Sequence, residues 1–256
     1  MKEIDEAFKQ TTKILLGAEL EEFENYSEWL FEHVPRPIKT KSSLSGKEVY
    51  VAPPRCFAKT GFDPKKAIDL DEMEQIKPIA KTLQDFDGLS YKAIACKYSA
   101  PIAVYCGNYR YSPFQNIEKS SGAGKGMNIL NCEDVYLDVK YIANSYYVNY
   151  SERIFGCVSL TFSKYCINCY NSTNLTRCFE MDGCTNCSDS YFCHNSEALS
   201  NCLFCFNAKS LRYAIGNIIF AKEEYMRLKS IILGEISSKL ENSKKLDLNI
   251  YNLGCK

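Results

Sequence analysis

The central part of the chain carries small or aliphatic residues at every third position. The run begins at Val139, and from Cys157 to Ala214 every third residue is Cys, Leu, Ser, Met or Ala. The intervening positions are rich in Asn, Thr, Tyr and charged residues. An α-helix repeats every 3.6 residues and a strand every second residue, so neither explains this period. The pattern is typical of a solenoid, in which short strand segments alternate with tight corners and small side chains stack inward.

A longer repeat is superimposed on this period. CxxC pairs recur at Cys166/Cys169, Cys184/Cys187 and Cys202/Cys205, and inward positions from Cys157 to Leu211 also repeat every ninth residue. Nonapeptide repeats build parallel β-helices. With two repeats to a coil, we expect about 18 residues per coil and roughly five coils over residues 127–217. This register would stack Cys166 over Cys184 over Cys202.

Asparagine marks the expected corners, because it tolerates the left-handed backbone conformation better than most residues. The corner candidates are Asn168, Asn171, Asn174, Asn186, Asn195 and Asn201. The predicted fold class is therefore mainly β: a right-handed parallel β-solenoid over residues 127–217.

Helical patterns flank this solenoid. Residues 1–37 show apolar stripes of two helices and predict a helical hairpin packed on the body, with an exposed docking arm as the alternative. In residues 218–256, apolar residues from Tyr225 to Leu240 have helical spacing and predict a capping helix, or a dimer-forming one if its apolar face stays free. We expect the tail from Lys244 to be loosely ordered.

Residues 38–126 predict a small mixed α/β region. Residues 48–51 read as a strand and residues 70–83 as a helix. The segment Ser120–Gly126 invites comparison with a phosphate-binding loop, but Lys119 and Gly126 stand where that motif requires Gly and Ser or Thr. A flexible linker or turn is expected there instead.

Charge and composition narrow the setting. The 256 residues include 31 basic and 31 acidic ones, so we expect neither nucleic acid nor an acidic membrane as a partner. No apolar run is long enough for a membrane span and no signal peptide is recognised. With 14 cysteines, a reducing cytoplasm or a virion is the expected location, with most thiols free.

The cysteines allow two main interpretations. As metal ligands, Cys166, Cys169, Cys184, Cys187, Cys202 and Cys205 have nearly the spacing of four-thiolate zinc sites, and zinc or an iron–sulfur cluster is the alternative cofactor. As core residues, they are small hydrophobes, and Leu175, Ser196 and Ala214 fill equivalent positions. We prefer the core interpretation, with no cofactor; disulfides between coils are a third possibility.

Catalytic candidates are scarce. The chain has only two histidines, His33 and His194. His33 is expected at a helix end, and His194 is expected to point outward, near Glu197 and a neighbouring thiol. Because a cysteine nucleophile needs an accessible thiolate beside a base, and the thiols are expected to face inward, we predict no catalytic residue and no enzyme.

Several segments resemble a known group of proteins. They are residues 165–172, 184–192, 201–207, the Leu211-Arg-Tyr turn and Lys222-Glu-Glu-Tyr225. Over residues 130–232 the chain is similar to uncharacterised Cys/Asn-rich, β-helix-like repeat proteins of prokaryotes and their viruses. Many of these also carry N-terminal zinc-ribbon cysteines, whereas this chain has only Cys56 before Cys96. The resemblance implies a solenoid with a helical cap and no particular activity.

The functional expectation is a structural or assembly protein. Tyrosine suits protein interfaces because it adds apolar area with a polar tip. The expected outward tyrosines are Tyr136, Tyr141, Tyr146, Tyr147, Tyr150, Tyr165, Tyr170 and Tyr191. We expect them to bind protein partners or other copies of the chain in a homo-oligomer, with a virion or another large assembly as the setting. The alternative is a metal-binding or redox-linked protein; carbohydrate processing rests on fold analogy alone.

Overall fold

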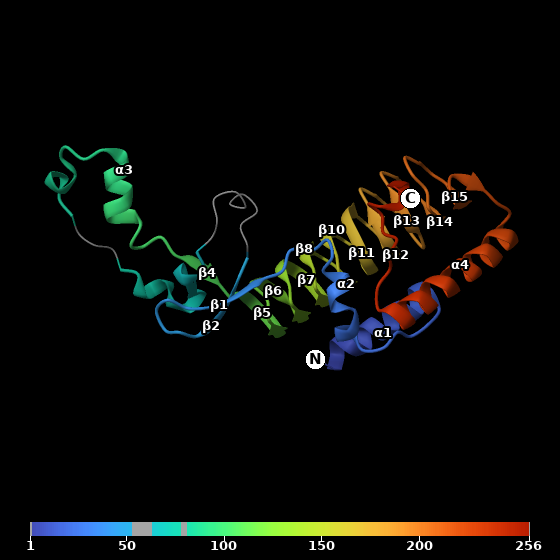
Figure 1. Cartoon of the computed structure of the whole chain (residues 1–256), viewed down its shortest axis with the longest axis horizontal. Coiled ribbons are helices and arrows are strands. Elements are labelled where there is room, and N and C mark those ends of the chain that lie inside the picture. Colours follow the sequence, from blue (N-terminus) through green and yellow to red (C-terminus); the bar gives the residue numbers. More distant parts are fainter. Residues whose placement is uncertain (1, 53–62, 78–80, 256) are drawn as a thin grey trace.

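The chain forms a parallel β-solenoid of about 9 turns with ~12 residues per turn, preceded by helix α1 and followed by helix α4. A computed structural model describes residues 2–52, 63–77 and 81–255. In Figure 1, the solenoid strands stack one beside the next, while α1 (Lys2–Leu16) and α4 (Lys222–Ser243) lie along one side. The predicted cysteine-containing parallel solenoid is confirmed; its right-handed winding stays a prediction.

The strands of the solenoid pair in chain order, except at β9. They are β5 (Tyr109–Glu118), β6 (Gly122–Leu130), β7 (Glu133–Ala143), β8 (Tyr146–Asn149), β9 (Glu152–Phe155), β10 (Val158–Thr161), β11 (Lys164–Thr173), β12 (Thr176–Asp182), β13 (Tyr191–His194), β14 (Ser200–Leu203) and β15 (Arg212–Ile215). The short β16 (Ile218–Ile219) turns back antiparallel on β15 and ends the sheet. The parallel pairing therefore begins at Tyr109, within the region predicted as mixed α/β.

The predicted coil of 18 residues is wrong. Cys166 pairs in register with Cys178, and Cys169 with Met181, so neighbouring turns are twelve residues apart. Cys166 therefore does not stack on Cys184, which lies one and a half turns further along. The thiol of Cys184 does contact the carbonyl of Cys193, nine residues on, at 3.4 Å. The carbonyl of Cys193 lies in the next turn, three residues before Ser196, which is the residue twelve positions after Cys184.

Corners follow one another at every third residue. From Tyr141 to Gly216, the backbone has positive φ at each third position, which gives four corners and four short sides per turn. All six asparagines predicted at corners have positive φ, between 46 and 55°. Tyr, Arg, Phe and Glu also occupy corners, although a left-handed conformation costs such residues roughly 1–2 kcal/mol. Contacts between turns must offset this cost.

Inward serines supply part of that compensation. The hydroxyl of Ser172 donates to the carbonyl of Tyr170 at 2.6 Å and accepts the backbone N–H of Cys184, twelve residues on, at 3.0 Å. The same acceptor role is taken by Ser120, Ser145, Ser151, Cys157, Ser163 and Ser196. These side chains satisfy backbone groups that would otherwise be buried without a partner, which costs about 1–3 kcal/mol each.

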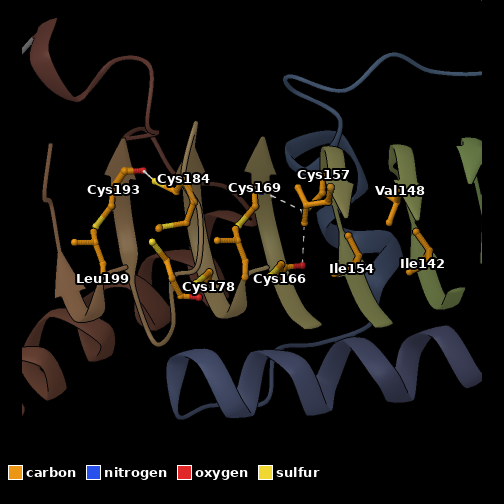
Figure 2. Close-up of a cluster of buried hydrophobic side chains, with 14 of the residues drawn as sticks. Ile142, Val148, Ile154, Cys157, Cys166, Cys169, Cys178, Cys184, Cys193 and Leu199 are labelled. Carbon is orange, nitrogen blue, oxygen red and sulfur yellow. Dashed lines mark hydrogen bonds between the residues drawn. The ribbon is translucent and has the colours of Figure 1, made fainter. Parts of the chain in front are cut away.

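The predicted ladder of inward side chains is confirmed. Its members from Val139 onward are buried, apart from the half-buried Leu211, and form one continuous core with Ala123, Ile129 and Val135. Figure 2 shows this core from Ile142 at one end to Leu199 at the other, with cysteines between. Because each side has only one inward residue, the interior is narrow and favours Ser, Cys and small aliphatic side chains.

Outward residues align in four columns, one per side of the coil. The helix side carries Ala143, Phe155, Ile167, Phe179, Tyr191 and Leu203. The tail side carries Tyr146, Val158, Tyr170, Asp182, His194 and Phe206. The open side carries Asn149, Thr161, Thr173, Thr185, Glu197 and Lys209. The polar side carries Glu152, Lys164, Thr176, Ser188, Ser200 and Arg212.

The helix side is covered because its column is apolar. Phe8 of α1 lies 5.2 Å from Phe155 and 5.7 Å from Phe23, ring centre to ring centre. Tyr225 of α4 is fully buried in the same cluster. Gly156 is needed at its corner, since a Cβ there would stand 2.9 Å from the carbonyl oxygen of Leu30. The apolar column thus fixes where both helices lie.

The N-terminal segment differs from the predicted hairpin. Only α1 is a long helix; the second stripe forms a 3-10 turn (Phe23–Tyr26) and the single helical turn α2 (Ser27–Leu30). The reason is tertiary packing, because Phe23, Tyr26 and Trp29 all turn onto the helix side instead of lining one face of a helix. Packing overrides helical periodicity here.

The region before the solenoid holds two small sheets. Strands β1 (Ile38–Lys41) and β2 (Glu48–Val51) are antiparallel, whereas β3 (Ala67–Asp69) and β4 (Tyr105–Gly107) are parallel. Its helices are short: the 3-10 segments Pro64–Lys66, Leu70–Gln75 and Leu83–Phe86, the α-helix α3 (Tyr91–Ile94) and the π-helical segment Ala95–Ser99. The strand at residues 48–51 is confirmed; the helix predicted for residues 70–83 extends only to Gln75 and partly falls outside the described residues.

The segment compared with a phosphate-binding loop is part of the solenoid. Gly122–Gly126 belongs to β6 and pairs with β5 and β7, so the expected linker is wrong. Its glycines allow close strand approach: a Cβ on Gly124 would stand 2.6 Å from the carbonyl oxygen of Tyr111.

The serine contacts can be tested at Ser172. We expect Ser172→Ala to lower the free energy of unfolding by about 1–3 kcal/mol, because the Cys184 N–H loses its acceptor. Ser172→Cys is the matched control and should cost less, since Cys157 already accepts the N–H of Cys169 at 3.2 Å. Denaturant unfolding measures both. Equal losses for the two variants would contradict the acceptor role.

Candidate functional site

The six candidate ligand cysteines all point into the solenoid and are buried. Cys166 and Cys202 share one inward column, and Cys169 and Cys205 share the next. Cys184 and Cys187 belong to the other two columns, because the second CxxC pair follows the first by one and a half turns. The three pairs therefore do not stack as the 18-residue register required.

The thiols instead contact backbone carbonyl groups. Each inward Sγ lies near the carbonyl two residues earlier, as Cys193 does with Tyr191 at 3.3 Å. Most also reach the carbonyl nine residues later, as Cys202 does with Leu211 at 3.4 Å. Within residues 2–52, 63–77 and 81–255, no group of three or more His, Cys, Asp or Glu is arranged to hold a metal ion. This geometry is the one expected for cysteines that act as core residues of the solenoid.

Burial raises the pKa of several inward thiols. It raises the pKa of Cys132 to about 12 and the pKa values of Cys169, Cys178 and Cys193 well above their usual value. In the contacting pair Cys184/Cys187, the hydrogen bond to Cys187 and burial raise the pKa of Cys184. In the CxxC thiols Cys187 and Cys205, by contrast, hydrogen bonds from Cys184 and from Cys193 and Cys202 lower the pKa. Because the thiolate is the reactive and metal-binding form, a raised pKa disfavours reaction and metal binding at Cys169 and Cys184.

The two histidines lie on or beside the tail side, away from the thiols. His194 points outward, with Nδ1 2.9 Å from Oδ2 of Asp182 on the preceding turn, while the adjacent Cys193 points inward. The suggested pairing of His194 with a thiol is therefore wrong. His33 packs edge-on against Tyr170 and Tyr251, with ring centres 5.8 and 5.0 Å away. Aromatic packing is the role that this geometry supports for His33.

The open side carries exposed aromatic side chains. Near its N-terminal end, Tyr111, Tyr147, Tyr150 and Phe162 are 40–57% exposed. The rings of Tyr150 and Phe162 stack in parallel at 4.8 Å. We call these four residues the aromatic patch. Tyr111 lies in the same register column as Tyr136 and Asn149, and the other three occupy corners beside that column.

Not every predicted outward tyrosine is available on the surface. Tyr170 and Tyr191 point outward but are only 2% exposed, because the tail and the helices cover them. Tyr136, Tyr141, Tyr146 and Tyr165 are half-buried. Period three identifies outward positions, but it cannot show which sides later segments will cover. Phe162 and Tyr111 were missed, although the same period places Phe162 at a corner.

Towards the C-terminal end, the open side becomes polar. Thr161, Thr173 and Thr185 follow one another along the column, and amide groups bridge the corners: Asn174 to Asn186 at 3.0 Å and Asn195 to Asn207 at 2.8 Å. Gly183 interrupts the second ladder, beside a shallow hollow of about 420 Å³ lined by Thr185, Asn195 and Lys209 among others.

Comparisons with known proteins leave the family open. Neither the comparison with protein-family models nor the one with curated proteins finds a match to this chain. Among the described residues, no helix is long and apolar enough to cross a membrane. The resemblance to Cys/Asn-rich repeat proteins therefore stays a prediction.

The variant Cys184→Ala distinguishes a core cysteine from a metal ligand. We expect it to cost about 1 kcal/mol, because the inward column of Cys184 already contains Ala208 and the Cys184 N–H keeps its acceptor. Cys178→Ala is the control, since Cys178 faces inward outside any CxxC pair and should cost a similar amount. Unfolding is measured together with zinc and iron content of anaerobically purified protein. Near-stoichiometric metal that is released by Cys184→Ala but not by Cys178→Ala would contradict the interpretation of these cysteines as core residues.

Proposed function

We propose that this chain is a non-enzymatic structural or assembly protein, a rigid β-solenoid that associates with copies of itself through the open side. The aromatic patch is the observation that carries this proposal: four large rings are 40–57% exposed on the open side and its corners. Aromatic residues dominate the energetics of protein interfaces.

The scaffold suits this role because its side-chain positions are fixed. The corner residues Tyr147, Tyr150 and Phe162 have left-handed backbone conformations held by neighbouring turns. A preorganised surface loses little conformational entropy on binding. The patch therefore offers apolar area at a low ordering cost.

Charge favours a second copy as the partner. Basic and acidic residues balance at 31 each, so two copies carry no net repulsion, and a net charge near zero promotes association. A two-fold contact would pair the patch of one copy with that of the other. The proposed setting is a large assembly such as a virion, or the cytoplasm, both compatible with free, buried cysteines.

Removing the aromatic patch should weaken self-association. We expect the double variant Tyr150→Ser, Phe162→Ser to raise the dissociation constant at least about tenfold, which corresponds to about 1.4 kcal/mol. Both rings are exposed, so stability should change little. Sedimentation equilibrium over a range of concentrations measures the association.

The control removes similar surface elsewhere. Tyr91 and Ile102 are 87% and 50% exposed in the region before the solenoid, and Tyr91→Ser with Ile102→Ser should leave association unchanged. A monomeric wild-type chain at all concentrations, or equal weakening by both double variants, would contradict self-association through the open side.

A further inference from the structure

A carboxyl group is buried beneath the C-terminal tail. Glu180 occupies a corner at the end of β12, is fully buried, and accepts two hydrogen bonds. Asn168 Nδ2 donates to Oε1 at 2.8 Å, and the backbone N–H of Ile250 donates to Oε2 at 3.0 Å. Both donors are neutral. An ionised carboxylate so enclosed lacks the opposite charge that normally accompanies burial.

The tail is docked on the tail side, contrary to the expected loose order. Leu246, Asn249 and Ile250 are buried, and Ile250 packs with Phe31, Val34, Val158 and Tyr170. Asn249 accepts the N–H groups of Tyr251 and Asn252, which tightens the turn over Glu180. We call residues 246–252 the clasp. In Figure 1, the chain crosses the solenoid near β12 after α4.

The groups around Glu180 come from every segment packed against it. From the N-terminal segment come Glu32 and His33, from β11 Tyr170, from β12 Asp182, and from the clasp Tyr251. Tyr251 donates its hydroxyl to Asp182, which also faces His194 of β13. The carboxylate of Glu32 disfavours a negative charge on Glu180, and neither histidine is hydrogen-bonded to it.

The side chain of Asn168 offers an acceptor for a proton on Glu180. Its Oδ1 is buried without a hydrogen-bond partner. This oxygen and the carbonyl oxygen of Leu30 converge on one point: a Cβ on Gly156 would lie 2.3 and 2.9 Å from them. Turning the amide by 180° presents Nδ2 towards the Leu30 carbonyl and Oδ1 towards Glu180. In that orientation a protonated Glu180 would donate to Oδ1 and give this acceptor a partner.

We propose that residues 246–252 form a proton-controlled clasp, which closes over Glu180 while this carboxyl carries a proton and loosens when the carboxyl ionises. Opening would uncover Tyr170 and Val158 on the tail side, which the clasp now shields from solvent.

The direction of the pH effect follows from burial. Burial raises the pKa of Glu180 from 4.5 to about 8 in the closed form, whereas solvent restores the ordinary value when the clasp opens. Closure is therefore strongest below the open-form pKa and weakens as pH rises towards 8. Within that window, the equilibrium between closed and open forms shifts about tenfold per pH unit towards the open form.

Hydrogen exchange of the Ile250 amide tests the clasp in the full-length chain. After correction for intrinsic exchange, we expect the wild-type rate to rise about tenfold per pH unit between pH 5.5 and 7.5 and to level off above 8. Glu180→Gln removes the titrating group and should abolish this dependence. Glu197→Gln, on the exposed open side, should retain it.

A second readout does not require the variant to fold. In wild-type protein with ¹³C-labelled glutamate, one carboxyl signal should titrate with a midpoint near 8. Protection of Ile250 that does not change from pH 5.5 to 8, an unchanged slope in Glu180→Gln, or the absence of a high-midpoint carboxyl signal would overturn the proposal.

Discussion

The hydrogen bonds that inward backbone N–H groups make across turns are the constraint on which this fold depends. A coil with a corner at every third residue leaves backbone groups pointing into a narrow interior, where water does not compensate them. Ser172 illustrates the solution, since one hydroxyl accepts from Cys184 in the next turn and donates to Tyr170 in its own turn. The side chain acts as part of the backbone hydrogen-bond system.

This constraint also accounts for the abundance of cysteine at inward positions. A thiol is small, apolar enough for burial, and still able to contact carbonyl groups. Cys157 accepts the N–H of Cys169, and Cys184 contacts the carbonyl of Cys193. The cysteines that resemble zinc ligands in sequence thus occupy inward positions of the solenoid, where their thiols contact backbone carbonyl groups.

The sequence pattern predicted the inward residues and corners of the solenoid well, but not which of its outer sides are covered by other segments. Period three identified the inward residues and all six asparagine corners, because both depend on local geometry. The turn length was missed, because the cysteines repeat every nine and every 18 residues whereas neighbouring turns pair twelve residues apart. The buried Tyr191 and the docked clasp were missed as well, because covering segments come from residues far apart in the chain.

The segments that cover the helix side and the tail side in turn determine which side of the solenoid is exposed to other molecules. The apolar helix side is covered by α1 and α4 and the tail side by the clasp, whereas the open side keeps its aromatic rings in solvent. A proton on Glu180 and an aromatic patch are then independent features of one rigid frame. Both depend on the register of the coil, which fixes which residues share a side.

Disulfide cross-linking tests that register most directly. Thr173 and Thr185 are paired on neighbouring turns, and Cα atoms of adjacent strands lie close enough for a disulfide. A turn of twelve residues predicts that Thr173→Cys with Thr185→Cys cross-links in the folded protein, detected by peptide mass spectrometry. Asn171→Cys with Asp189→Cys, eighteen residues apart, should not. Cross-linking of the second pair alone would contradict the account.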